Sequence, residues 1–60
     1  MVTVDEKIDD LETNGNNVVG IEIEDGYYNI YYVDSSDALH KLQLLVNGEE
    51  IVKEISDTVV

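Results

Sequence analysis

The chain has 60 residues and a formal net charge of −11, because fourteen Asp and Glu residues outnumber three lysines. It contains no Cys, which excludes disulfide bonds and zinc sites with cysteine ligands. The shortage of cations argues against direct binding to nucleic acid and against anionic membranes, since phosphate contacts need Lys or Arg and only Lys7, Lys41 and Lys53 are present.

A chain of this length is expected to form a single domain, residues 1–60, with a small core. No apolar run approaches the roughly 20 residues of a membrane span. The start Met1-Val2-Thr3-Val4-Asp5 lacks the basic residues of a signal peptide. We therefore expect a cytoplasmic protein.

Residues 3–12 are predicted to form a short acidic helix. Thr3 and Glu6 have the spacing of a capping box. Val4, Ile8 and Leu11 recur as one narrow apolar stripe. A helix of this length is mostly unfolded by itself in water, so it needs the rest of the domain or a partner.

Val18–Glu24 and Tyr27–Val33 are predicted to form a hairpin around Asp25-Gly26, a dipeptide that suits a two-residue type I′ turn. This turn fixes the pairing, so that Ile21 faces Ile30 and Val19 faces Tyr32. One face, the inner face, then carries Val19, Ile21, Ile23, Tyr28, Ile30 and Tyr32. The outer face carries Glu22, Glu24, Tyr27, Asn29 and Tyr31.

Residues 36–46 are compatible with two structures. Ser36 could cap a leucine-rich helix that packs on a three-stranded sheet. Alternatively, a loop over Asp34–Ala38 would pair Tyr32 with His40 and keep apolar residues opposite each other. We favour the strand, which gives an α+β fold that is mostly β: a short N-terminal helix followed by a four-stranded antiparallel meander over residues 18–55.

A second turn at Asn47-Gly48 is predicted to lead into a strand over Glu50–Ile55. The expected register pairs Leu44 with Ile51 and Lys41 with Glu54, and it places Lys53 on the inner face. Residues 56–60 are expected to be a frayed tail. Its last residues resemble the Ser/Thr-x-apolar ending that PDZ domains capture, a short pattern that recurs by chance.

The sequence offers no convincing catalytic or metal site. Asp10, Glu12 and Asn14 match the start of a calcium loop, but Ile21 stands where the loop needs a bidentate Glu. His40 is expected on the inner face as a neutral ring bonded to Tyr32 or to the backbone. No serine elbow or glycine-rich phosphate loop is present. We therefore expect a protein that is not an enzyme, with no cofactor and no metal.

The outer face of the sheet is predicted to be a contact surface, because the helix is too narrow to cover its apolar residues. Tyr27 and Tyr31 form its centre, and Glu22, Glu24 and Asp25 form its rim. The apolar residues expected there are Val18, Tyr27, Tyr31, Val33, Leu39, Leu45 and Val52.

In size, acidity and lack of catalytic groups, the chain resembles the DNA-mimic inhibitors that phages and mobile elements make against glycosylases, restriction enzymes and CRISPR nucleases. The resemblance covers the composition of the whole chain and involves no motif. It implies an inhibitor that binds a larger protein through a basic surface that otherwise holds nucleic acid. The partner-binding residues expected from charge and exposure are Asp9, Asp10, Glu12, Glu22, Glu24, Asp25, Tyr27 and Tyr31.

The spacing of the acids limits such mimicry. A DNA strand carries a charge every ~3.4 Å, whereas one face of a β-strand places carboxylates only every ~6.8 Å. The helix acids and the strand acids would have to act together, or two subunits would have to combine theirs. The alternative is a self-associating structural or adaptor module, a homodimer for example, that uses the Tyr27 and Tyr31 face.

Overall fold

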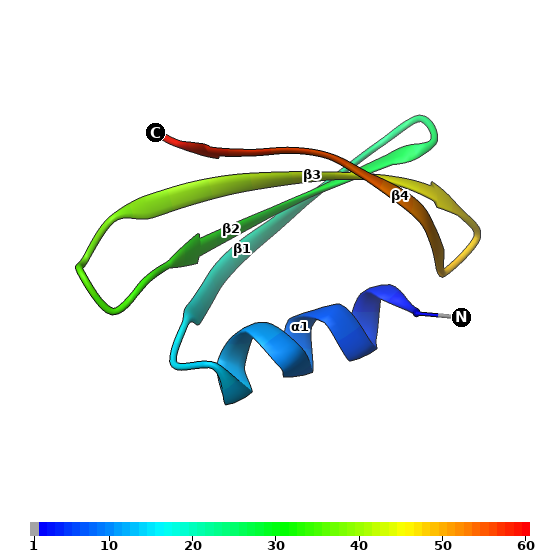
Figure 1. Cartoon of the computed structure of the whole chain (residues 1–60). Helices are drawn as coiled ribbons and strands as arrows, with labels where there is room; N and C mark the ends of the chain where they lie inside the picture. The colour runs from blue at the N-terminus through cyan, green and yellow to red at the C-terminus, as the bar shows by residue number, and fades with distance from the viewer. Residues whose placement is uncertain (1) are drawn as a thin grey trace.

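The computed structural model describes residues 2–60, so Met1 of the expected domain lies outside the described residues. Helix α1 (Val4–Thr13) precedes β1 (Asn17–Glu24), β2 (Tyr27–Val33), β3 (Leu39–Asn47) and β4 (Glu50–Val59). The strands form one antiparallel sheet in the order β1-β2-β3-β4, and α1 lies across one face of it (Figure 1). This arrangement confirms the expected α+β meander. The alternative helix over residues 36–46 is wrong.

Helix α1 begins where the capping box predicts. The Glu6 backbone N–H donates to Thr3 Oγ1 at 3.2 Å, and the Thr3 backbone N–H donates to Glu6 Oε1 at 3.1 Å. Val4 and Leu11 are buried against the sheet. The Val4 N–H also donates to the Glu49 carbonyl at 3.0 Å, so the turn between β3 and β4 fixes the start of α1. Within the described residues, no helix is long and apolar enough to cross a membrane.

The first hairpin has the predicted pairing near its turn and a different one near its open end. Ile21 pairs with Ile30 as expected, but Val18, not Val19, pairs with Tyr32. Gly20 pairs with Tyr31, so Val19 is an extra residue that forms a bulge. The bulge turns Val18 to the inner face, where it packs against the core, and leaves Val19 exposed. The sequence predictions for both valines are therefore wrong.

The turn of this hairpin is not type I′. Gly26 has a φ of +79°, but Asp25 does not have a positive φ, which a type I′ turn requires at both central residues. The register beside the turn is unaffected, because the loop still has two residues.

The pairing of β2 with β3 is the one expected from apolar matching. Tyr32 pairs with His40, and Ile30 pairs with Leu42. Asp34 stabilises the connecting loop, because its Oδ1 accepts hydrogen bonds from the backbone N–H groups of Ser36 and Ala38 at 2.8 and 3.0 Å. The centre of the core is almost fully buried and consists of Ile30, Leu42 and Leu44.

The register of β4 differs from the predicted one. The turn consists of Gly48 and Glu49, one residue later than expected, and Asn47 pairs with Glu50. Two irregularities follow, where Val52 and Ile55 are extra residues on β4. Both extra residues are exposed, which is consistent with bulged positions.

These shifts change the partners of several side chains. Leu44 pairs with Glu54 instead of Ile51, and Lys41 pairs with Thr58 instead of Glu54. Lys53 pairs with Leu45, which places it on the outer face. The strand continues to Val59, so the expected tail over residues 56–60 is wrong.

Candidate functional site

The acidic side chains lie at the surface. Of the fourteen acidic residues, all within the described chain, thirteen are exposed and only Asp34 is partly buried. The six acids predicted to bind a partner are therefore accessible. They do not share one face, because α1 covers the inner face of the sheet whereas Glu22 and Glu24 project from the outer face.

The charged residues of α1 lie on different sides of the helix. Asp5, Asp9 and Glu12 follow the four-then-three spacing of one helical flank. Asp5 lines a groove together with residues of β1, so this flank faces β1. Lys7 lies on the other flank, with its Nζ 4.0 Å from Glu54 Oε1 of β4. Asp10 points away from both, toward solvent.

The β1 side of the molecule thus carries an acidic surface, which we define as Asp5, Asp9, Glu12, Glu22, Glu24 and Asp25. The lysines, all within the described residues, lie elsewhere: Lys7 on the flank of α1 toward β4, Lys41 on β3 and Lys53 on β4. The structure therefore separates the acids around β1 from the cations.

The outer face of the sheet is not covered by α1 (Figure 1). Tyr27 is exposed and Tyr31 is partly buried. The Tyr31 hydroxyl donates to Glu22 Oε1 at 2.9 Å, and this hydrogen bond raises the pKa of Tyr31. Asn29 lies between the two tyrosines, fully buried, and neither atom of its side-chain amide has a hydrogen-bond partner among the described residues.

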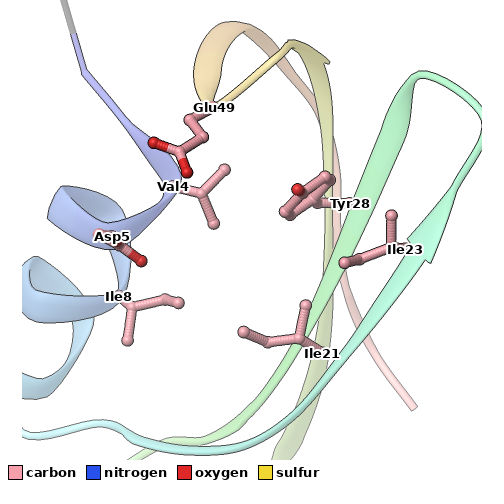
Figure 2. A pocket seen from close by; sticks show the side chains of 7 residues that line it. All are labelled: Val4, Asp5, Ile8, Ile21, Ile23, Tyr28 and Glu49. Carbon is pink, nitrogen blue, oxygen red and sulfur yellow. The ribbon is translucent and has the colours of Figure 1, made fainter.

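An open groove lies on the inner face, between α1 and β1 (Figure 2). It has a volume of about 240 Å³, and its floor is apolar. Ile21 and Ile23 face it, and they were expected in the core but are 45% and 69% exposed. The prediction fails because α1 contacts β1 without covering Ile21 and Ile23, which line the open groove between them. The lining residues are Val4, Asp5, Ile8, Ile21, Ile23, Tyr28 and Glu49.

A hydrogen-bonded cluster, which the sequence did not predict, joins the loop after β2 to the end of β4. His40 Nε2 is 2.6 Å from Asp34 Oδ2, and His40 Nδ1 is 2.9 Å from Asp57 Oδ1. The Tyr32 hydroxyl donates to the other oxygen of Asp57, and its ring stacks on the His40 ring with centroids 4.6 Å apart. We call these four residues the His40 cluster.

The two carboxylates stabilise the protonated form of His40. Hydrogen bonds to Asp34 and Asp57 raise the pKa of His40. The ring nitrogens bond to these two carboxylates and not, as expected, to Tyr32 or to the backbone. The hydrogen bond from His40, with those from the backbone of Ala38 and Ser36, lowers the pKa of Asp34. Burial, followed by the hydrogen bond to Asp57, raises the pKa of Tyr32.

The cluster is suited to holding β4 in place. Both ring nitrogens of His40 are engaged, so neither is free to take a proton from a substrate. Sequence reasoning missed it because Asp57 was assigned to the tail. The β-branched residues Thr58 and Val59 were a signal that the strand continues past Ile55.

The described residues include no group of three or more His, Cys, Asp or Glu side chains placed to hold a metal ion. Comparisons with protein-family models, with curated proteins and with solved structures each found no match to this chain.

Proposed function

We propose that this chain is a small acidic protein, without enzymatic activity, that binds and inhibits a larger protein by occupying a basic surface, of the kind that otherwise holds nucleic acid. The observation that supports this proposal is the acidic surface around β1, from which the three lysines are displaced. Such a surface attracts a basic partner over distances of about 10 Å at moderate salt and disfavours nucleic acid itself.

The geometry favours a partner that contacts β1 from its edge. Asp9 and Glu12 share the helix flank of Asp5, which faces β1, while Glu22 and Glu24 lie on the opposite face of the sheet. A basic surface that contacts the edge therefore meets both sets of acids. This is the combination of helix and strand acids that mimicry of a nucleic acid strand requires.

The test is competition for nucleic-acid enzymes. The chain is titrated into binding reactions of a DNA glycosylase, a restriction endonuclease and a CRISPR nuclease with their labelled DNA. We expect displacement of DNA from at least one enzyme, with an apparent affinity that falls steeply as sodium chloride is raised. No displacement from any of the three enzymes at low salt contradicts the proposal.

Two matched variants separate the acidic surface from net charge. Glu22→Gln with Glu24→Gln removes two charges beside β1, and Asp37→Asn with Glu54→Gln removes two elsewhere. Surface ion pairs contribute about 0.2–1 kcal/mol each, so the first variant should bind about two- to thirtyfold more weakly than the second. Equal affinities would show that net charge alone drives binding.

The second candidate function is self-association through the outer face. The uncovered outer face supports it, because Tyr27 is exposed there and α1 does not cover it. Sedimentation velocity would then show a dimer that persists in high salt and dissociates in the Tyr27→Ser variant. A monomer at all concentrations contradicts this candidate without affecting the first.

A further inference from the structure

The groove between α1 and β1 exposes apolar side chains that a domain of this size normally buries. Ile23 and Ile21 face Val4 and Ile8 across it (Figure 2). More than half of Ile23 and nearly half of Ile21 is accessible to solvent. The carboxylates of Asp5 and Glu49 lie beside this apolar floor, and no cation is among the lining residues. An apolar area with a polar rim is typical of a surface that contacts another molecule.

The hydrogen bonds between β2 and β3 show which residues of β2 have backbone groups available to bond to β1. The Val46 N–H donates to the Gly26 carbonyl, and the Asp34 N–H donates to the Ala38 carbonyl, both at 3.0 Å. Because bonding to one neighbour alternates along an antiparallel strand, the even-numbered residues of β2 bond to β3. The odd-numbered residues therefore bond to β1.

This alternation leaves specific backbone groups of β1 free. Tyr27 and Asn29 are odd-numbered, and their partners on β1 are Glu24 and Glu22. The intervening Ile21 and Ile23 direct their N–H and C=O groups away from β2, toward the open edge of the sheet. The two residues that line the groove thus also offer unpaired backbone groups.

The other edge of the sheet is partly closed. The Ile51 N–H at the start of β4 donates to the Val2 carbonyl at 2.9 Å, and Thr3 forms an antiparallel bridge with Glu50. Within residues 2–60, no segment pairs with β1 on its outer side in this way. An unprotected edge is where a further strand can add.

The surroundings of β1 determine which residues such a strand would carry. On the inner face its side chains would meet Ile21 and Ile23, which favours apolar residues. On the outer face they would meet Glu22 and Glu24, which favours Lys or Arg. Because strand side chains alternate between faces, the two preferences alternate along the sequence. A second copy of β1 is disfavoured, since it would place Glu22 and Glu24 against their own copies.

We propose that the groove and the β1 edge together bind an extended segment of a partner protein, in which apolar residues alternate with lysine or arginine, as a fifth strand of the sheet. This inference rests on the proposed function, because it requires a basic partner. It adds the mode of binding: backbone hydrogen bonds to Ile21 and Ile23, apolar contacts in the groove and ion pairs with Glu22 and Glu24.

Two synthetic peptides of identical composition test the proposal on the full chain. In one peptide lysine and valine alternate, and in the other the same residues form two blocks. Calorimetry at low salt should show the alternating peptide binding about tenfold more tightly, since only it can bury its apolar residues in the groove and its lysines on the other face. Amide hydrogen exchange at Ile21 and Ile23 should slow when this peptide binds.

Matched substitutions locate the site. Ile23→Thr removes apolar surface from the groove, and Val52→Thr removes apolar surface from β4. The two residues are similarly exposed, Ile23 at 69% and Val52 at 60%. We expect Ile23→Thr to weaken binding of the alternating peptide about tenfold and Val52→Thr to leave it within about twofold. The alternating peptide N-methylated on the residues that face β1 should lose binding to the unaltered chain, which tests the backbone contacts without a protein variant.

The outcomes separate the two proposals. Equal binding of both peptides, without protection of the two amides, overturns the added strand and leaves the acidic binding protein intact. No binding of either peptide at low salt overturns both. Protection of Ile21 and Ile23 that rises with protein concentration in the absence of peptide assigns the edge to a second copy and overturns the proposed occupant.

Discussion

His40 shows how a single side chain can hold two distant segments of this chain together. Its ring contacts Asp34 in the loop after β2 and Asp57 near the end of β4. Each carboxylate stabilises the imidazolium form, and the stacked Tyr32 ring excludes water from one side. The protonation of one residue is thus coupled to the position of the last strand.

This coupling predicts a pH dependence of stability. Since the folded-state pKa of His40 is raised above its ordinary value of 6.5, the stabilisation is complete below that value and is lost as pH rises through the folded-state pKa. Wild-type chain should therefore lose unfolding free energy relative to the His40→Gln variant as the pH rises above about 6.5. Urea unfolding of both chains at several pH values, with an NMR titration of His40, checks this.

The comparison with His40→Gln cancels the general repulsion among carboxylates, which both chains share. At acidic pH the direction is opposite, and stability falls as the pH is lowered. The pKa of Asp34 is lowered, so its contribution is lost as pH falls through that folded-state pKa. Parallel stability profiles for the two chains above pH 6 would show that the His40 cluster does not contribute.

At the scale of elements, α1 depends on contacts at its first turn. Only Val4 and Leu11 of the helix are buried, and its capping box is complete. A helix this short is not stable in isolation, so the cap and the contact with the turn after β3 determine whether it forms. The position of α1 in turn defines the groove beside β1.

Removal of the cap should therefore have a measurable effect. Thr3→Ala deletes the hydroxyl that accepts from the Glu6 N–H, and we expect a loss of about 1 kcal/mol in unfolding free energy. Thr13→Ala, at the last residue of α1, is the matched control and should change it little, because Ala favours helix. Urea unfolding measures both. Equal losses for the two variants would contradict a specific role for the cap.

The strands show which parts of the sheet register can be predicted from sequence patterns. Alternation and apolar matching correctly predicted β2 and β3, because the loop after β2 allows the register that places Ile30 opposite Leu42 and keeps apolar residues on the inner face. The bulges at Val19, Val52 and Ile55 were not predictable, since each is an apolar residue that fits regular pairing equally well. The His40 cluster was missed for this reason, because it depends on the shifted register of β4.

The candidate site was predicted in part. Exposed acids are visible in the sequence as an excess of charge, so the exposure of Glu22 and Glu24 was predicted correctly, while their binding of a partner stays a prediction. The groove was not predicted, because it results from where α1 crosses the sheet and not from any residue of β1. Ile21 and Ile23 looked like core residues by alternation alone.

At the scale of the whole molecule, charge opposes the compact state. With a net charge of −11 over 60 residues, carboxylates repel one another more strongly when the chain is folded than when it is extended. The acidic surface around β1 concentrates this repulsion. In the proposed function, the same charges that destabilise the fold attract the basic partner.

Sodium chloride should therefore act in opposite directions on folding and on binding. Raising it from low concentration to about 0.5 M should increase the unfolding free energy by on the order of 1 kcal/mol, because repulsion is screened, while it weakens partner binding. Urea unfolding at both salt concentrations checks the first effect. The double variant Glu22→Gln, Glu24→Gln should gain less unfolding free energy from added salt, because it carries fewer repelling charges. A stability that falls or stays constant with salt would contradict net self-repulsion.

The contact between the first residues of the chain and β4 has a consequence for the order of folding. Each hairpin joins neighbours along the sequence and can close early, whereas residues 2–4 meet residues 49–51 only once residue 51 has been synthesised. During translation, the amino-terminal helix therefore gains this contact late, and we expect the hollow beside β1 to take shape after the hairpins have closed.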